Sequence, residues 1–222
     1  MNYFILSATQ SDICPISLIE DANLYANKEQ VNSNFESGYL PWYSYKTSKT
    51  CDLPIQGLLV LKNKKIKISI RNINEDIYVV DEIFKNIFEK YIDSKFSKIE
   101  LLSEKLEKIN DQNYYIFRFE KHKDFENVLD LNKSIYKLSN DFLILEKVEF
   151  LKGLDENIIK FNNIDSAQDT LFISEVVKNE IESNKYHGIN IFDINSADWR
   201  DSDDFSFMFL NEDEVNKMVW PI

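Results

Sequence analysis

Glycine is scarce in this 222-residue sequence, which contains four of them: Gly38, Gly57, Gly153 and Gly188. The common phosphate-binding loops place several glycines within a few residues, so that the backbone can approach the phosphate closely. Four glycines spread over the whole chain cannot form such a loop. The sequence therefore excludes nucleotide-binding enzymes of these common types.

Cysteine and histidine are equally rare, with two of each. Cys14 and Cys51 stand 37 positions apart, which is neither a disulfide framework nor a zinc-binding spacing, so we expect a reducing compartment. His122 and His187 lie far apart, and neither has a partner four residues away, as a helical metal site would need. We therefore expect no metal ion and no cofactor.

The common signatures of nucleophilic catalysis are also missing. No Gly-x-Ser-x-Gly motif occurs, and neither cysteine has a histidine nearby in the sequence. The 38 acidic residues always allow some pair of carboxylates to meet in space, so their abundance by itself indicates nothing. We expect a protein that is not an enzyme. The alternative is a small-molecule enzyme whose site forms only in the folded structure.

Long hydrophobic runs are absent. Apolar segments such as Leu58–Leu61 and Phe142–Leu145 are short, whereas a membrane span needs roughly 20 residues. The N-terminal Met1–Leu6 lacks the basic start and the cleavage site of a signal peptide, and we expect it to form a strand. These features predict a soluble, cytoplasmic protein with no membrane partner.

The sequence does contain enough apolar residues for a core, together with an excess of acid. Hydrophobic residues make up 44% and aromatic residues 14%, above the level of disordered chains. The net charge of -12 repels nucleic-acid phosphates and attracts a basic protein. One basic cluster stands out at residues 62–71. A solvated hairpin explains it, and a module that binds nucleic acid is the alternative that we rank last.

Apolar patterns alternate between strand and helix along the chain. Segments 57–61 and 66–70 predict a hairpin, and the spacing of apolar residues from Val79 to Ile92 predicts a helix. Ser174 is the expected N-cap of a further helix. Further strands are expected at 114–119, 142–151, 171–173 and 189–194.

These patterns predict an α+β fold with a mixed, largely antiparallel sheet and a few packed helices. The length suits one large domain or two lobes. For two lobes, we expect an N-terminal α/β lobe at 1–100, which begins with a loop-rich stretch at 9–56, and a C-terminal α+β lobe at 101–222. The charged stretch 94–112 is the best candidate for the boundary between them.

The excess acid is concentrated near the C-terminus. Between Asp193 and Glu214, eight acidic residues stand against a single basic residue, Arg200. Three phenylalanines alternate there as on a strand: Phe205, Phe207 and Phe209. We therefore expect this segment to be folded. It is either a solvated edge around one core strand or a surface for a basic partner, with an aromatic anchor and a carboxylate rim.

The candidate partner-binding residues come from this segment and from one aromatic loop. The C-terminal candidates are Asp198, Trp199, Asp201, Asp203, Asp204 and Phe205. The other candidates, Trp42 and Tyr43, belong to the stretch 39–45, in which four of seven residues are aromatic. These rings either pin the loop onto the core or form an exposed binding patch.

A resemblance adds to this interpretation. Residues 170–178 have the sequence Thr-Leu-Phe-Ile-Ser-Glu-Val-Val-Lys, and Lys185-Tyr186-His187-Gly188-Ile189 follows. This strand, Phe-x-Ser helix start and glycine-led strand resemble a family of bacterial immunity proteins encoded beside polymorphic toxins and first described as a domain of unknown function. The similarity is best from 114 to 192. The family pattern is Gly-x-x-Phe, and Gly188–Phe192 is one residue longer.

The resemblance implies a function and carries no catalytic residues. It implies a cytoplasmic protein that binds a cognate toxin domain and neutralises it by occluding its active site or substrate path. A basic toxin such as a nuclease would suit the acidic charge of this chain. The identity of the toxin, the contact surface and the oligomeric state stay open at this point.

Overall fold

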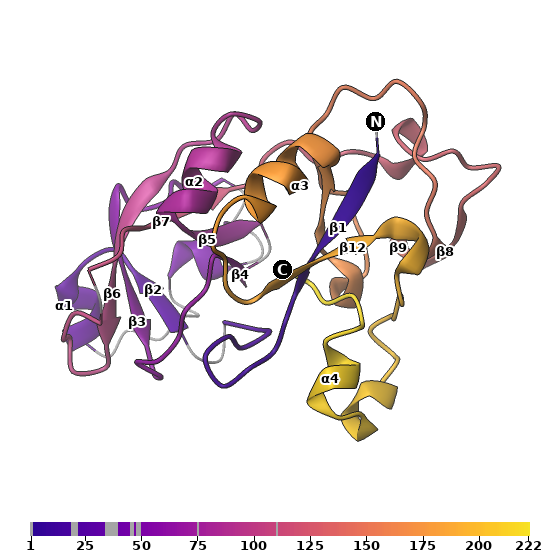
Figure 1. Cartoon of the computed structure of the whole chain (residues 1–222). Helices are drawn as coiled ribbons and strands as arrows, with labels where there is room; N and C mark the ends of the chain where they lie inside the picture. Colours follow the sequence, from indigo (N-terminus) through magenta and orange to yellow (C-terminus); the bar gives the residue numbers. More distant parts are fainter. Residues whose placement is uncertain are drawn as a thin grey trace. The chain divides into compact units, whose positions relative to one another are not determined.

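The computed structural model describes residues 2–18, 22–33, 40–44, 47, 50–74, 76–109 and 111–222. The chain divides into two compact units. The terminal unit combines Met1–Ser11 with Lys121–Ile222, and the central unit is Asp12–Glu120. Figure 1 shows the central unit mainly in purple and magenta, and the later part of the terminal unit in orange and yellow. The mixed and antiparallel sheets with short helices confirm the predicted α+β class.

This division differs from the predicted boundary near residue 100. The stretch 94–112 contains β6 (Ser97–Ser103), a strand inside the central sheet. The N-terminal strand β1 (Tyr3–Ala8) pairs with two strands from the C-terminal half of the chain. Its side chains Ile5 and Leu6 are fully buried there. Long-range pairing of β1 therefore decides which unit it joins, and local composition gives no sign of it.

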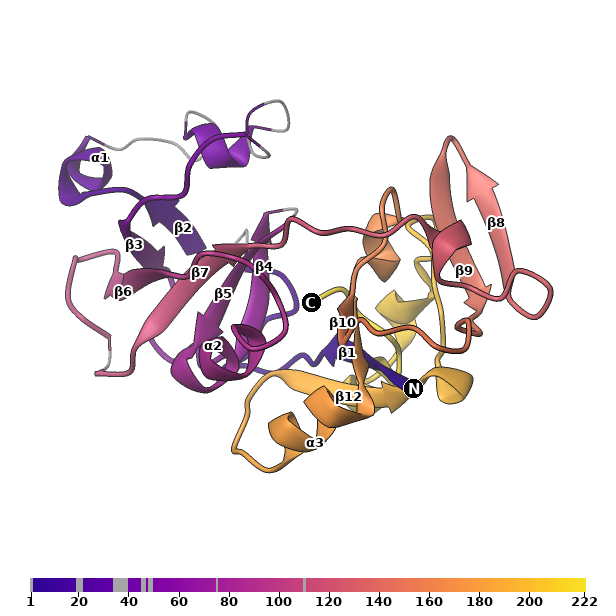
Figure 2. The same ribbon diagram turned by 90° about the horizontal axis from the view of Figure 1, so that it is seen from above.

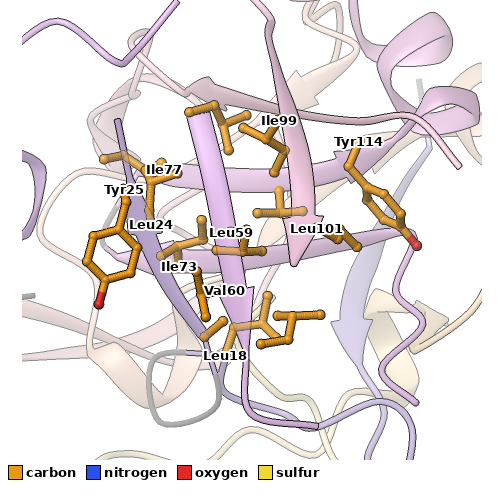
Figure 3. Close-up of a cluster of buried hydrophobic side chains, with 14 of the residues drawn as sticks. Leu18, Leu24, Tyr25, Leu59, Val60, Ile73, Ile77, Ile99, Leu101 and Tyr114 are labelled. Carbon is orange, nitrogen blue, oxygen red and sulfur yellow. The ribbon is translucent and has the colours of Figure 1, made fainter. Parts of the chain in front are cut away.

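The central unit is built on a mixed sheet in the order β2-β3-β6-β7-β5-β4. Its remaining strands are β2 (Ala22–Tyr25), β3 (Gln56–Leu61), β4 (Ile70–Asn74), β5 (Ile77–Asp81) and β7 (Tyr114–Arg118). In the described part of this sheet, β3 and β6 run parallel and the other pairs are antiparallel. Figure 3 shows the core, in which Leu24, Leu59 and Leu101 come from neighbouring strands. Strand β7 confirms the strand expected at 114–119.

Helix α2 (Glu82–Phe88) is shorter than the predicted helix. Val79 and Val80, expected in its first turn, belong to β5, where they are fully buried and pair with β4 and β7. Their β-branched side chains suit a strand better than a helix. Asp81 ends the strand and caps the helix, because its carboxylate accepts a hydrogen bond from the Phe84 N–H at 2.8 Å.

The predicted hairpin at 57–61 and 66–70 is wrong. Strand β3 pairs with β2 and β6, and β4 begins only at Ile70. Ile66 and Ile68 are buried although they lie outside any strand. Burial in a non-regular segment therefore produces the alternating pattern that the sequence shows here.

The terminal unit contains an antiparallel sheet in the order β10-β11-β1-β12. Its strands besides β1 are β10 (Ile158–Ile159), β11 (Leu171–Ser174) and β12 (Ile189–Asp193). These confirm the strands expected at 171–173 and 189–194. Helix α3 (Glu175–Glu182) follows β11, and the Ser174 side chain accepts a hydrogen bond from the Val177 N–H, as expected for an N-cap.

A separate two-stranded sheet consists of β8 (Ile135–Ser139) and β9 (Phe142–Lys147), which lie side by side in Figure 2. Asn140 and Asp141 join them, with φ angles of 49° and 68°. Two successive left-handed residues form the turn that matches the twist of a hairpin, and Asn and Asp tolerate this backbone conformation. Strand β9 confirms the start of the strand expected at 142–151. The sequence favours a helix or a turn over residues 125–138, and β8 shows that this prediction is wrong for the end of that stretch.

The remaining helices among the described residues are short. They are α1 (Lys28–Asn32), α4 (Glu212–Val215) and the 3-10 helices η2 (Pro41–Tyr43), η3 (Phe125–Asn127), η4 (Ser166–Gln168), η5 (Ile194–Ser196) and η6 (Ser206–Phe209). No helix in the described part of the chain is long and apolar enough to cross a membrane. The core of the terminal unit is aromatic, with Phe172 at 5.3 Å from Phe150 and 5.1 Å from Phe161 between ring centroids.

Candidate functional site

The C-terminal acidic segment, residues 193–214, is folded without a strand. The strand predicted from the alternation of Phe205, Phe207 and Phe209 is wrong, because Ser206–Phe209 forms the 3-10 helix η6. The Asp204 carboxylate accepts a hydrogen bond from the Ser206 N–H at 2.9 Å. A short acidic side chain that bonds to the backbone in this way favours a turn over an extended strand.

Arg200 anchors this segment from inside. It is buried, and its guanidinium carbon lies 3.9 Å from the ring centroid of Trp220 and 4.6 Å from that of Phe207. The two rings meet edge to face at 5.0 Å. Burial lowers the pKa of Arg200, and the charges of Asp204 and Asp198 oppose that effect. The single basic residue of the segment is therefore engaged within the fold.

Trp220 connects this arrangement to the sheet of the terminal unit. Its backbone N–H donates to the Ser7 hydroxyl at 2.8 Å, and its indole Nε1 donates to the Val215 carbonyl at 2.7 Å. Ser7 lies on β1, so the C-terminal segment is fixed against the central part of the sheet. Helix α4 carries a reciprocal cap in which the Asn211 and Glu214 side chains bond each other's backbone N–H groups.

Four large apolar side chains are nevertheless exposed on this anchored segment. Phe205 is 60% exposed, Met208 68%, Phe209 91% and Leu210 38%. We call these four residues the exposed apolar group. Clustered exposure of this kind in a folded segment marks an interaction surface more often than scattered single side chains do. Of these four, Phe205 is among the residues predicted from the sequence as partner-binding, and the other three are not.

Carboxylates lie on both sides of the exposed apolar group in the chain. Asp198 and Asp203 are exposed, and Asp201 and Asp204 are half-buried. The pKa of Asp204 is lowered, mainly because the Ser206 N–H donates to its carboxylate. Three more acids follow in α4, and each of them is exposed: Glu212, Asp213 and Glu214. Carboxylate side chains therefore flank the exposed ring of Phe205 in the chain, which is the combination that the sequence predicts.

Trp199 differs from the expected exposed anchor. Its ring is half-buried against the core of the terminal unit, 6.0 Å from the ring of Phe172 between centroids. The neighbouring Asp198 uses its carbonyl to accept a hydrogen bond from the Val219 N–H at 3.3 Å. Trp199 therefore fixes the start of the segment and offers only part of its surface to a partner.

Trp42 and Tyr43 lie on η2 in the central unit, and the other candidates belong to the terminal unit. Trp42 is buried, and the Tyr43 hydroxyl accepts a hydrogen bond from the Leu24 N–H at 2.8 Å. Burial raises the pKa of Tyr43 to about 12. The described rings of this loop therefore pack onto the core, as in the first of the two interpretations of 39–45. Tyr39 and Tyr45 lie outside the described residues.

Lys137 of β8 contacts the acidic segment. Its Nζ lies 3.1 Å from a carboxylate oxygen of Asp201, and Asp201 also accepts a hydrogen bond from the Asp203 N–H. The pKa of Lys137 is raised, first by this bond to Asp201 and then by the charges of Asp201, Glu146 and Asp203. The hairpin β8–β9 therefore lies next to the acidic segment within the terminal unit.

The basic cluster at 62–71 contributes less than its sequence suggests. Arg71 is fully buried, and its Nε donates to the Pro15 carbonyl at 2.9 Å. Burial lowers the pKa of Arg71 to about 10. Lys64 pairs with Glu107 at 2.5 Å. The basic side chains that this cluster exposes are therefore lysines and include no arginine, which is a poor match for nucleic-acid recognition.

The described cavities do not gather the rare catalytic residue types. A cavity of about 530 Å³ in the central unit has Lys28, Lys98, Glu100 and Lys108 as its charged lining, and a smaller one of about 200 Å³ lies in the terminal unit. Neither is lined by His122 or His187. Within the described ranges, no three His, Cys, Asp or Glu side chains come together as metal ligands. No protein-family model matches the chain, and no curated protein matches it.

Proposed function

We propose that this protein is a cytoplasmic inhibitor of the immunity type, which binds a basic toxin domain through the exposed apolar group and the carboxylates beside it. The supporting observation is the exposure of Phe205, Met208 and Phe209 on an anchored, acidic segment. The sequence resemblance at 170–192 agrees with this function. Inhibition would follow from occlusion of the active site or substrate path of the toxin, and no catalytic step by this chain is required.

The energetics of such a surface are favourable. Each large apolar side chain that is fully buried by a partner contributes about 1.5–3 kcal/mol. Aromatic side chains at the centre of an interface usually supply most of the affinity, whereas the surrounding charges mainly accelerate association. The exposed apolar group would supply the affinity, and the charges of Asp203, Glu212 and Asp213 would accelerate association. A toxin with a positive active-site groove is the partner that this surface fits best.

The apolar part of this proposal is tested by a double alanine variant. Phe205→Ala with Phe209→Ala should raise the Kd for the toxin domain encoded beside this gene by about 100-fold or more, because two ring contacts are lost. Isothermal titration calorimetry with the purified toxin domain measures the change. The matched control is Ile55→Ala, since Ile55 is 89% exposed and lies in the central unit. Binding of the double variant within about threefold of wild type would contradict the proposal.

The electrostatic part is tested by association kinetics. Asp203→Asn should slow association with the toxin domain at low salt, and the difference should shrink as salt is added, because screening weakens steering by exposed charges. Asp111→Asn removes the same charge from an exposed site in the central unit and serves as the control. Equal effects of the two variants would show that net charge alone, and not this surface, guides the partner. Absence of any complex with the neighbouring toxin would refute the function as a whole.

A further inference from the structure

Among the described residues, the hairpin beside the acidic segment has one paired edge and one open edge. On β9, the Leu143 N–H donates to the Asn163 carbonyl at 2.7 Å, and the Leu143 carbonyl accepts from the Asp165 N–H at 2.8 Å. The backbone of Leu145 makes an equivalent pair of bonds with the Gln168 side chain, at 2.7 and 3.0 Å. The backbone groups of both leucines therefore point away from β8.

This geometry fixes the direction of the backbone groups on β8. Leu143 lies opposite Leu138 in the register, and Leu145 lies opposite Tyr136. In an antiparallel pair, residues that face each other without exchanging hydrogen bonds direct their N–H and C=O groups outwards on both strands. The backbone groups of Tyr136 and Leu138 therefore point to the outer edge of β8. In the part of the chain that the structure describes, no other strand and no hydrogen bond from another segment meets them.

Little protects this edge against another strand. Proteins usually block an open edge with charges, prolines or bulges, because unpaired backbone groups attract extended chains. Lys137 is the single charged residue of β8, and Asp201 already pairs with it. Ile135, Leu138 and Phe142 are each more than half exposed along the hairpin. An irregularity in the register occurs between Ile135 and Tyr136, and the stretch from Tyr136 to Ser139 is regular.

We propose that an extended segment of the basic toxin pairs with the outer edge of β8 and adds a third strand to the β8–β9 sheet. This inference rests on the proposed function and names how the partner binds. The bound strand carries lysine or arginine among apolar residues, because Asp201, Asp203 and Glu146 surround Lys137 while Leu138 offers apolar contact. A second copy of this chain is disfavoured as the occupant, since each copy carries a net charge of -12.

A proline at an outward-pointing position tests the backbone pairing. Leu138→Pro removes an N–H that β9 does not use, so the hairpin should still fold, as prolines are tolerated on edge strands in this orientation. Leu138→Ala removes the same side chain and keeps the N–H. We expect Leu138→Pro to bind the neighbouring toxin domain about tenfold more weakly than Leu138→Ala, because one interstrand hydrogen bond is lost and the proline ring obstructs the approaching strand. Equal affinities of the two variants would overturn strand pairing.

Amide hydrogen exchange on the wild-type protein gives an answer that does not depend on how the proline variant folds. The amides of Tyr136 and Leu138 should exchange rapidly in the free protein and slow by about tenfold or more in the complex. The amide of Lys137 points towards β9 and should be protected in both states, which makes it the internal control. Unchanged exchange at Leu138 in a formed complex would overturn strand pairing.

The outcomes separate the two proposals. If Phe205→Ala with Phe209→Ala weakens the complex while Leu138→Pro and Leu138→Ala behave alike, the toxin-binding function stands and the added strand is refuted. If the wild-type protein forms no complex with the neighbouring toxin, both proposals are refuted. If Leu138→Pro binds about tenfold more weakly than Leu138→Ala and remains folded by its thermal melt, the added strand is supported.

Discussion

Replacing Arg200 with alanine should loosen the C-terminal acidic segment while the rest of the terminal unit stays folded. The guanidinium lies 3.9 Å from the centroid of Trp220 and 4.6 Å from that of Phe207, and it also donates to the Asp204 carbonyl at 3.4 Å. Each desolvated cation–ring contact contributes about 2 kcal/mol, and the weak hydrogen bond adds less than that. The alanine also loses the packing of the aliphatic stem.

The expected net change is smaller than the sum of these contributions. Burial of the guanidinium itself is unfavourable, as its lowered pKa indicates, and the alanine variant is relieved of this cost. We expect the local free energy of opening to fall by about 2 kcal/mol, which corresponds to about a 30-fold faster exchange of protected hydrogens. The indole N–H of Trp220 is the best reporter, because it donates to the Val215 carbonyl inside this segment.

The controls distinguish ring stacking from charge. Arg200→Lys keeps the charge and loses the planar group that stacks on both rings, so its exchange rate should lie between those of wild type and alanine. Lys217→Ala removes an exposed cation close in the sequence and should have little effect. If Arg200→Ala changes the exchange of the Trp220 indole by less than about threefold, the arginine does not anchor the segment and the reasoning is wrong.

Two further predictions concern the cores of the two units. Burial raises the pKa values of Tyr3 and Tyr43 to about 12, so both phenols should titrate well above pH 10 when phenolate absorbance is measured. The stability that their protonated forms contribute should be complete below pH 10 and should be lost as the pH rises towards 12. Titration of both near pH 10 in the folded protein would contradict this. Gln168→Ala should lower the free energy of unfolding by about 3 kcal/mol in urea titrations, because the buried N–H and C=O of Leu145 lose their hydrogen-bond partners. A change below about 1 kcal/mol would contradict this prediction.

The sequence by itself determined the local elements whose signals lie within a few residues. Ser174 caps α3 because its hydroxyl satisfies a free backbone N–H group of the acidic first turn, and this interaction does not depend on the rest of the fold. Strands β7, β11 and β12 follow from dense β-branched and aromatic residues. The acidic character of residues 193–214 also follows directly from composition.

Only the tertiary structure decided which faces are buried and which strands pair. Val79 and Val80 fit a helical pattern, but the pairing of β5 with β4 and β7 places them in a strand. Strand β1 joins the C-terminal half of the chain because its apolar residues find partners more than 160 positions away, and no local pattern encodes that distance.

The candidate binding surface was likewise predictable only in part from the sequence. The carboxylates and Phe205 were visible in the sequence, because charge and aromatic content are properties of the residues themselves. The exposure of Met208 and Phe209 and the burial of Trp42 were not, since exposure depends on what packs over a side chain. The open edge of β8 is the clearest example. Asn163, Asp165 and Gln168 bond the outer side of β9, while no described strand pairs with the outer side of β8, and both arrangements arise only when the chain has folded.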